Sequence, residues 1–231
     1  MRSTAMPTML ALLLFLVAPI LVQAQDEAKQ EEAEKTPEAT IAELQEKVAK
    51  LERQVTILEL EKLGAVVHVE EPEEGKEGET LTRVSLPKPW HGDAEALDRI
   101  KSLPAVRVLY IDNSQFDDES AAKLKDLADL TALTIMSPAL TDAALEHLKE
   151  LEGLDMLFLT DTKVGDEGLE HLKGLKNLKE LSLSRTAVTD AGLEKLKELE
   201  NLGTLYLIGV ELSDEAVAKL QEARPNTRIV R

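Results

Sequence analysis

Five aspartates recur along the chain with a 24-residue spacing that could assemble carboxylates into one site. If the segments that carry them stack, equivalent residues form a column, and a column of carboxylates could hold cations. The alternative is structural, because each aspartate lies at the start of an expected helix, where an acidic side chain caps free amides and complements the helix dipole. We favour capping. The aspartates are Asp118, Asp142, Asp166, Asp190 and Asp214.

Two histidines are a second candidate for metal chemistry. His147 and His171 have the same 24-residue spacing and share their column with Lys123, Lys195 and Lys219. Stacked imidazoles could bind a metal ion, but no third ligand accompanies them, whereas a zinc site needs at least three protein ligands. We expect a solvent-facing basic column that alternates with glutamates, no metal site and no cofactor.

No catalytic motif stands in the sequence. There is no cysteine, no Gly-x-Ser-x-Gly elbow, no phosphate-binding loop and no His-Glu-x-x-His helix. In a chain with 44 acidic residues, close pairs of carboxylates are uninformative. We therefore expect a protein that is not an enzyme.

The composition excludes several classes of partner and anchor. The formal net charge is -17, and such a surface repels nucleic acid and anionic lipid. Without cysteine there is neither a disulfide framework nor a lipid-modified cysteine. We expect a core held by packing alone and no nucleic-acid partner.

Residues 1–24 have the pattern of a secretory signal peptide. Arg2 precedes an apolar stretch that runs from Met9 to Val22, and Val22-Gln23-Ala24 fits a small-residue cleavage signal. The apolar stretch contains Pro19 and is shorter than the roughly 20 residues that span a bilayer, so an uncleaved anchor is the weaker alternative. We expect cleavage, no stable membrane anchor afterwards, and a location that is secreted, periplasmic or in the cell envelope.

A helix is expected at residues 40–63, between an acidic leader and an acidic linker. Its apolar residues alternate at spacings of three and four, with β-branched residues at a and leucines at d, as in a parallel two-stranded coiled coil. The seam covers fewer than three heptads, so either two copies dimerise through residues 41–62 or the stripe packs on the rest of the chain. Residues 25–39 are expected to be a disordered leader and residues 64–80 a flexible linker. The seam residues are Ile41, Leu44, Val48, Leu51, Val55 and Leu58.

From Val106 onward the sequence repeats itself with a 24-residue period and without a gap. In the fourth copy, Leu178, Leu181 and Leu183 have the spacing of a short strand, and later leucines recur at every third position as on one face of a helix. One copy cannot bury its leucines alone, so we expect the copies to stack into a parallel sheet with a continuous core. The repeats are 106–129, 130–153, 154–177, 178–201 and 202–225, after a degenerate cap at 81–105.

The leucine spacing and the segment Thr189-Asp190-Ala191-Gly192-Leu193 resemble the leucine-rich-repeat family, in its ribonuclease-inhibitor-like or cysteine-containing subtype. The resemblance covers residues 81–231. It implies an α/β right-handed solenoid with a parallel sheet on the concave face and helices on the convex face, and it implies partner binding rather than a particular partner. Where the cysteine-containing subtype has a cysteine after the strand, this chain has Ser114, Pro138, Thr162, Thr186 and Val210.

The expected outward face of the strands carries the candidate binding residues. Its middle column reads Tyr110, Thr134, Phe158, Ser182 and Tyr206, and it holds both tyrosines of the chain. Clustered aromatic and methionine side chains on an exposed face are typical of a binding patch, although such residues also simply suit pleated surfaces. The neighbours that complete the candidate patch are Met136, Met156 and Ile208, with Arg107 and Arg185 on its polar rim.

The sequence therefore favours an exported, non-catalytic leucine-rich-repeat protein that binds a protein or peptide on the concave face. Two alternatives stay open. One is a structural spacer or assembly module of the cell envelope that acts through its helical stalk. The other is a glycan-binding module whose tyrosines stack on sugar rings.

Overall fold

A computed structural model describes residues 37–72, 78–88, 90, 92 and 94–231 of the chain. The expected signal segment 1–24 and most of the expected leader 25–39 lie outside these residues. The chain forms two compact units, Met1–Glu52 and Arg53–Arg231, which are described separately.

The long helix α2 (Pro37–Lys62) contributes residues to both units. It begins at a proline, which the first helical turn tolerates because its amide needs no partner there. It ends at Lys62, two residues before Gly64, whose φ of 93° is left-handed, and the amide of Ala65 donates to the carbonyl of Leu60. No helix within the described residues is long and apolar enough to span a bilayer.

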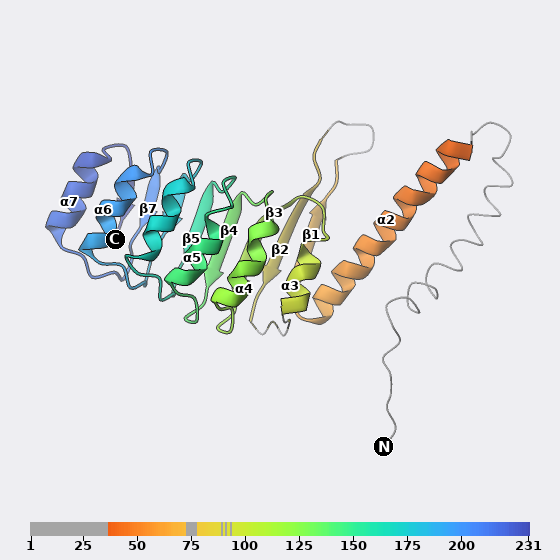
Figure 1. The fold of residues 1–231 in the computed structure, drawn as a ribbon, viewed down its shortest axis with the longest axis horizontal. Coiled ribbons are helices and arrows are strands. Elements are labelled where there is room, and N and C mark those ends of the chain that lie inside the picture. Colours follow the sequence, from red (N-terminus) through yellow and green to blue (C-terminus); the bar gives the residue numbers. More distant parts are fainter. Residues whose placement is uncertain (1–36, 73–77, 89, 91, 93) are drawn as a thin grey trace, which may run out of the picture. The chain divides into compact units, whose positions relative to one another are not determined.

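The second unit is built on one sheet, which has eight strands in the described part of the chain (Figure 1). The strands lie side by side in chain order; β1 pairs with β2 antiparallel, and every later pair is parallel. From β3 onward each residue pairs with the one 24 positions later, as Leu109 does with Leu133. The strands are β1 (Val66–Glu70), β2 (Leu81–Leu86), β3 (Val106–Asp112), β4 (Ala132–Met136), β5 (Met156–Leu159), β6 (Glu180–Ser182), β7 (Thr204–Tyr206) and β8 (Arg228–Val230).

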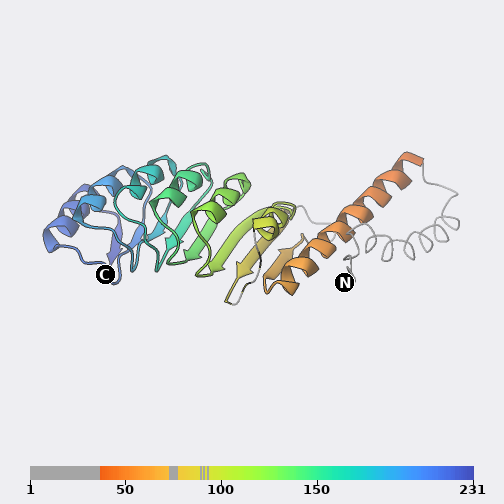
Figure 2. The same ribbon diagram turned by 60° about the horizontal axis from the view of Figure 1, so that its bottom comes forward.

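Short helices and 3-10 turns cover one face of this sheet and leave the other face, called here the open face, without a helical layer in the described part of the chain (Figures 1 and 2). The expected α/β leucine-rich-repeat solenoid is thereby confirmed. The helical elements are α3 (Ala94–Ile100), α4 (Asp118–Ala122), η1 (Lys123–Asp126), α5 (Asp142–Leu148), η2 (Gly168–Gly174), α6 (Asp190–Lys195), η3 (Leu196–Glu198) and α7 (Asp214–Ala223).

The repeated leucines form the core between the strands and the helices. Equivalent strand leucines are fully buried in every repeat, and so are the helical leucines that face them. One continuous cluster runs from Leu60 at the end of α2 to Leu220 in α7. The strand column consists of Leu109, Leu133, Leu157, Leu181 and Leu205, each 0% exposed.

Two strands lie where the sequence analysis expected none. Residues 66–70, assigned to the acidic linker, form β1, because Val67 packs into the core and the alternating residues face outward. The glutamates that suggested a linker begin only at Glu70, where the strand ends. Beyond the fifth repeat, β8 pairs with β7, and Ile229 lies beside Leu205, where it continues the 24-residue period.

Candidate functional site

The open face brings the predicted middle column together. Cα register joins Tyr110 to Thr134, Thr134 to Phe158, Phe158 to Ser182 and Ser182 to Tyr206. These residues alternate with the buried core residues of the same strands, so they belong to the face away from the helices. Tyr110, Phe158 and Tyr206 are all partly buried.

Phe158 and Tyr206 pack against each other although a strand separates them. Their ring centroids are 5.6 Å apart with an interplanar angle of 69°, an edge-to-face contact that aromatic pairs favour. The residue between them is Ser182, which is small and only 4% exposed. A small residue in the middle strand allows the two rings to meet, so the pair forms one apolar patch rather than two separate anchors.

The remaining apolar candidates extend this patch in both directions. The hydroxyl group of Tyr110 lies 3.4 Å from Sδ of Met136 at the end of the neighbouring strand. Met156 lies beside Glu180 in the adjacent column and is partly buried. Ile208 follows β7 and is 46% exposed, which makes it the most exposed of the apolar candidates.

The two arginines predicted for the rim are bound to acidic residues of this chain. Arg107 donates to Glu79 at 2.6 Å. Arg185 donates two hydrogen bonds to the carboxylate of Asp161, at 2.5 and 2.6 Å, and these bonds lower the pKa of Asp161 and raise the pKa of Arg185. Neither arginine is therefore a free cation, and the rim offers paired charges to a partner.

A column of left-handed residues supports the Arg185 pair. Asp161 and Arg185 have φ values of 57° and 54°, and Gly209, at the equivalent position of the next repeat, has a φ of 71°. A Cβ at Gly209 would lie 2.9 Å from Cγ of Arg185, so glycine leaves the space that the arginine side chain occupies. The turns after the strands are thus fixed in one conformation along this edge of the open face.

The prediction that the column of aspartates caps the helices is wrong. The helices are capped not by these aspartates but by the residue before them: the Thr189 hydroxyl accepts from the amide of Ala191, and Ser213 accepts from Ala216. Asp214 pairs with Arg231, whereas the other four aspartates reach the next repeat. Asp166 accepts from the Thr189 amide at 2.8 Å and from its hydroxyl at 2.6 Å. The same inter-repeat bond joins Asp118 to Thr141, Asp142 to Gly165 and Asp190 to Ser213.

These aspartates also explain the repeated glycines. A Cβ at Gly168 would lie 2.5 Å from Oδ1 of Asp142, and one at Gly192 would lie 2.3 Å from Oδ1 of Asp166. Each glycine leaves room for the carboxylate of the preceding repeat. Both glycines thus pack tightly against a carboxylate, and the column of aspartates is a structural feature whose carboxylates already have partners.

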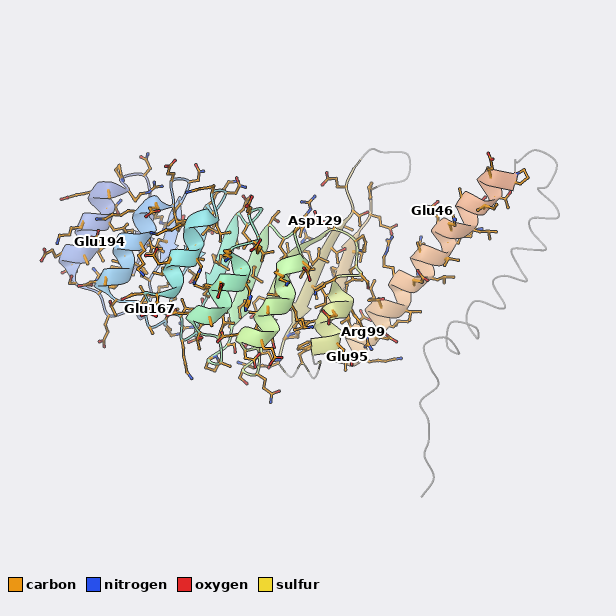
Figure 3. All side chains as sticks on the ribbon, viewed as in Figure 1. Glu46, Glu95, Arg99, Asp129, Glu167 and Glu194 are labelled. Carbon is orange, nitrogen blue, oxygen red and sulfur yellow. The ribbon has the colours of Figure 1, made fainter. Side chains whose placement is uncertain are left out.

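The outer side of the helical layer is covered by charged residues, among them the exposed Glu167 and Glu194 (Figure 3). Two lysines of the predicted basic column bind acids of the preceding repeat, Lys123 with Asp98 at 3.0 Å and Lys195 with Glu170 at 3.2 Å, whereas Lys219 pairs with Glu215 of its own helix. The described residues contain no group of three or more histidine, cysteine, aspartate or glutamate side chains arranged to hold a metal ion. The open face is therefore the candidate site.

Comparison with known proteins agrees with the repeat assignment. Residues 174–197 match a family model described as a leucine-rich repeat, whereas no curated protein matches the chain. Among solved structures, an internalin of Listeria monocytogenes, inlF, is 23% identical with a TM-score of 0.48, and the match covers 60% of this chain and 37% of the internalin. Internalin C2 of the same organism is 24% identical with a TM-score of 0.45, and the match covers 58% of this chain and 54% of that protein.

A plant peptide hormone receptor, RGFR1, solved in complex with RGF2, is also similar. It is 15% identical with a TM-score of 0.38, and the match covers 58% of this chain and 22% of the receptor. The chain thus spans well under two thirds of the length of these structures. Likenesses at these identities carry no information about a ligand of this chain.

Proposed function

From the premise that the chain is a leucine-rich-repeat protein, we propose that it is an exported, non-catalytic binding protein that takes a protein or peptide on the open face of its sheet. The observation that carries the proposal is the joined aromatic pair of Phe158 and Tyr206, with the exposed Ile208 following the same strand. Rigid aromatic side chains on a preformed surface lose little entropy on binding and are enriched at the energetic centres of interfaces.

Recognition on this face must use side chains. The strands β3 to β7 are paired on both sides, so their backbone amides and carbonyls are engaged within the sheet and a partner cannot add a strand among them. The arginines of the rim are neutralised within the chain. Apolar contact with the aromatic pair is therefore the main source of affinity, and the net charge of -17 favours partners that are neutral or basic.

Export and repeat subtype belong to the same proposal. The Arg2 and apolar pattern of residues 1–24 supports secretion to the periplasm, cell envelope or exterior. Mass spectrometry of the protein from a secreting host should then find a chain that begins at Gln25. If all of the protein still carries residues 1–24, export with cleavage is contradicted. The ribonuclease-inhibitor-like subtype is supported by the Thr-Asp-x-Gly-Leu segment and its 24-residue period.

Selection from a displayed library of random peptides tests the binding proposal. The bait is the chain from Gln25 onward, which keeps every described element. Three variants are compared with it: alanine at Tyr110, Phe158 and Tyr206 together; Ile208→Glu, which changes a side chain that is 46% exposed and should leave the fold intact; and a control with alanine at the exposed Glu146, Glu167 and Glu194 of the helical layer.

We expect peptides that bind the unchanged chain and the helical-layer control but lose at least tenfold in affinity on both open-face variants. Thermal unfolding of each variant checks that it is folded. Peptides that bind all four proteins equally, or a failure to select any peptide, would contradict the proposal. If polysaccharides instead bind in a manner that depends on the two tyrosines, the open face is a glycan site.

A further inference from the structure

Most of the exposed large apolar side chains of the described residues lie on α2. Four of the six exposed large apolar side chains in the described part of the chain belong to its heptad seam: Ile41 is 55% exposed, Leu44 39%, Val48 41% and Leu58 53%. Leu51 and Val55 complete the seam and are partly buried. An apolar stripe of this extent is unfavourable in water unless something covers it.

The opposite side of the same helix is already covered. In the second unit Leu60 is fully buried, Ile57 packs against the core and Arg53 pairs with Glu71. At about 100° of rotation per residue, Ile57 and Leu60 each lie about 150° around the helix from the centre of the seam, one on either side. Within the second unit, α2 therefore packs on the repeats mainly through the side away from the seam, so this packing and dimerisation through the seam are compatible.

We propose that the seam pairs with the seam of a second copy of this chain as a parallel, two-stranded coiled coil. The residue types fit that partner: isoleucine and valine occupy the a positions and leucine the d positions, a choice that favours parallel dimers. The proposal does not depend on the ligand of the open face.

Charge at the edges of the seam selects the parallel orientation. With Ile41 at position a, Lys47 is a g residue and faces Glu52 of the second copy, and the reciprocal contact forms as well. In the antiparallel pairing of the same seam, Lys47 faces Gln54 instead, so the ion pair with Glu52 is lost. Within one copy Lys47 lies 3.7 Å from Glu43, an exposed pair that contributes little and is readily exchanged.

The docked end makes so short a coil feasible. An isolated helix of this length is marginal in water because its first turn is costly to form. Here residues 53–62 are held helical by packing on the repeats, so the seam is partly ordered before the second copy arrives.

Light scattering coupled to size exclusion tests the proposal on the chain from Gln25 onward. We expect a mass of two chains at micromolar concentrations. Val48→Glu places a charge at an exposed a position and should weaken dimerisation at least tenfold, whereas the matched control Ala49→Glu, on the outer side of the helix, should not. A monomer for the unchanged chain up to about 100 µM, or equal loss in both variants, overturns the proposal.

A charge exchange tests the orientation. Lys47→Glu and Glu52→Lys should each weaken the dimer severalfold, because each creates like-charge contacts across the parallel seam, and the double variant should restore it. Single variants that dimerise as well as the unchanged chain would exclude the parallel arrangement. Ultraviolet circular dichroism confirms that each variant keeps its helix content.

Discussion

At the scale of single residues, the carboxylates at the helix starts hold the repeats in register. Asp166 binds both the amide and the hydroxyl group of Thr189, and that hydroxyl group in turn accepts from the amide of Ala191. The cap of one helix is thereby tied to the helix before it. Because charge-assisted hydrogen bonds of this kind are stronger than neutral ones, the column adds to the leucine core a polar connection that fixes the stacking.

Asp166→Ala should lower the free energy of unfolding by about 1–3 kcal/mol, because it removes two hydrogen bonds to a carboxylate and leaves the Thr189 amide without that acceptor. The matched control is Asp214→Ala. Asp214 is the equivalent residue of the last repeat, but no described helix follows α7, and Asp214 pairs with Arg231 on the surface. We expect the control to change stability by less than about 0.5 kcal/mol. Urea unfolding measures both, and equal losses would show that the inter-repeat bond has no special role.

Low pH should weaken the stabilising effect of Asp190, which belongs to the same column of aspartates. Hydrogen bonds from the hydroxyl group and amide of Ser213 lower the pKa of the Asp190 carboxyl. A carboxyl with a lowered pKa stabilises the fold at pH values above its unfolded pKa of about 3.9, and this contribution is lost as the pH falls through the folded value. The stability difference between the unchanged chain and Asp190→Asn should stay constant from about pH 7 to 5 and shrink below about pH 4. Urea unfolding at a series of pH values checks this, and a difference that grows in acid contradicts it.

The sequence located these aspartates but not their partners. Their 24-residue spacing and their place beside threonine predict the helix start correctly. Whether the carboxylate turns to its own helix or to the next one depends on the distance between stacked repeats and on the space left by Gly168 and Gly192, which no single repeat reveals. The same holds for Phe158 and Tyr206, whose contact depends on the small residue between them.

At the scale of elements, α2 has two apolar faces with different partners. Leu60 is fully buried against the second unit, whereas Leu58 is 53% exposed. Leu60→Ala should therefore cost about 2–5 kcal/mol of unfolding free energy, as large-to-small core substitutions do. Leu58→Ala should cost less than about 0.5 kcal/mol in the monomer. Urea unfolding below the concentration at which the chain dimerises separates the two, and comparable losses would show that the faces are misassigned.

The strands and helices of the repeats were predictable because the leucines return, in the same surroundings, with a 24-residue period. The two strands outside that pattern were not foreseen. Strand β1 carries Val66, Val67 and Val69, and β-branched residues of this kind favour a strand. The glutamates that follow are typical of a linker, and they led to the wrong prediction for this segment. Strand β8 had a signal in Ile229, which keeps the period of the repeats after the last helix.

At the scale of the whole molecule, a binding sheet and a pairing helix in one chain make a bivalent protein. If two copies join through α2, a partner that presents two sites meets a raised effective concentration at the second sheet, and its apparent affinity rises without any new contact. Binding of such a partner should then fall for Val48→Glu and not for Ala49→Glu. A single-site peptide should bind both variants equally well, which separates avidity from the contact itself.

The most direct measurement of the central claim is hydrogen–deuterium exchange of the chain from Gln25 onward, with and without a peptide selected on it. We expect the peptide to slow exchange in the segments that carry Tyr110, Phe158 and Tyr206 and to leave the helices α4 to α7 unchanged. Protection confined to the helical layer or to α2 would place the binding surface elsewhere and contradict the assignment of the open face.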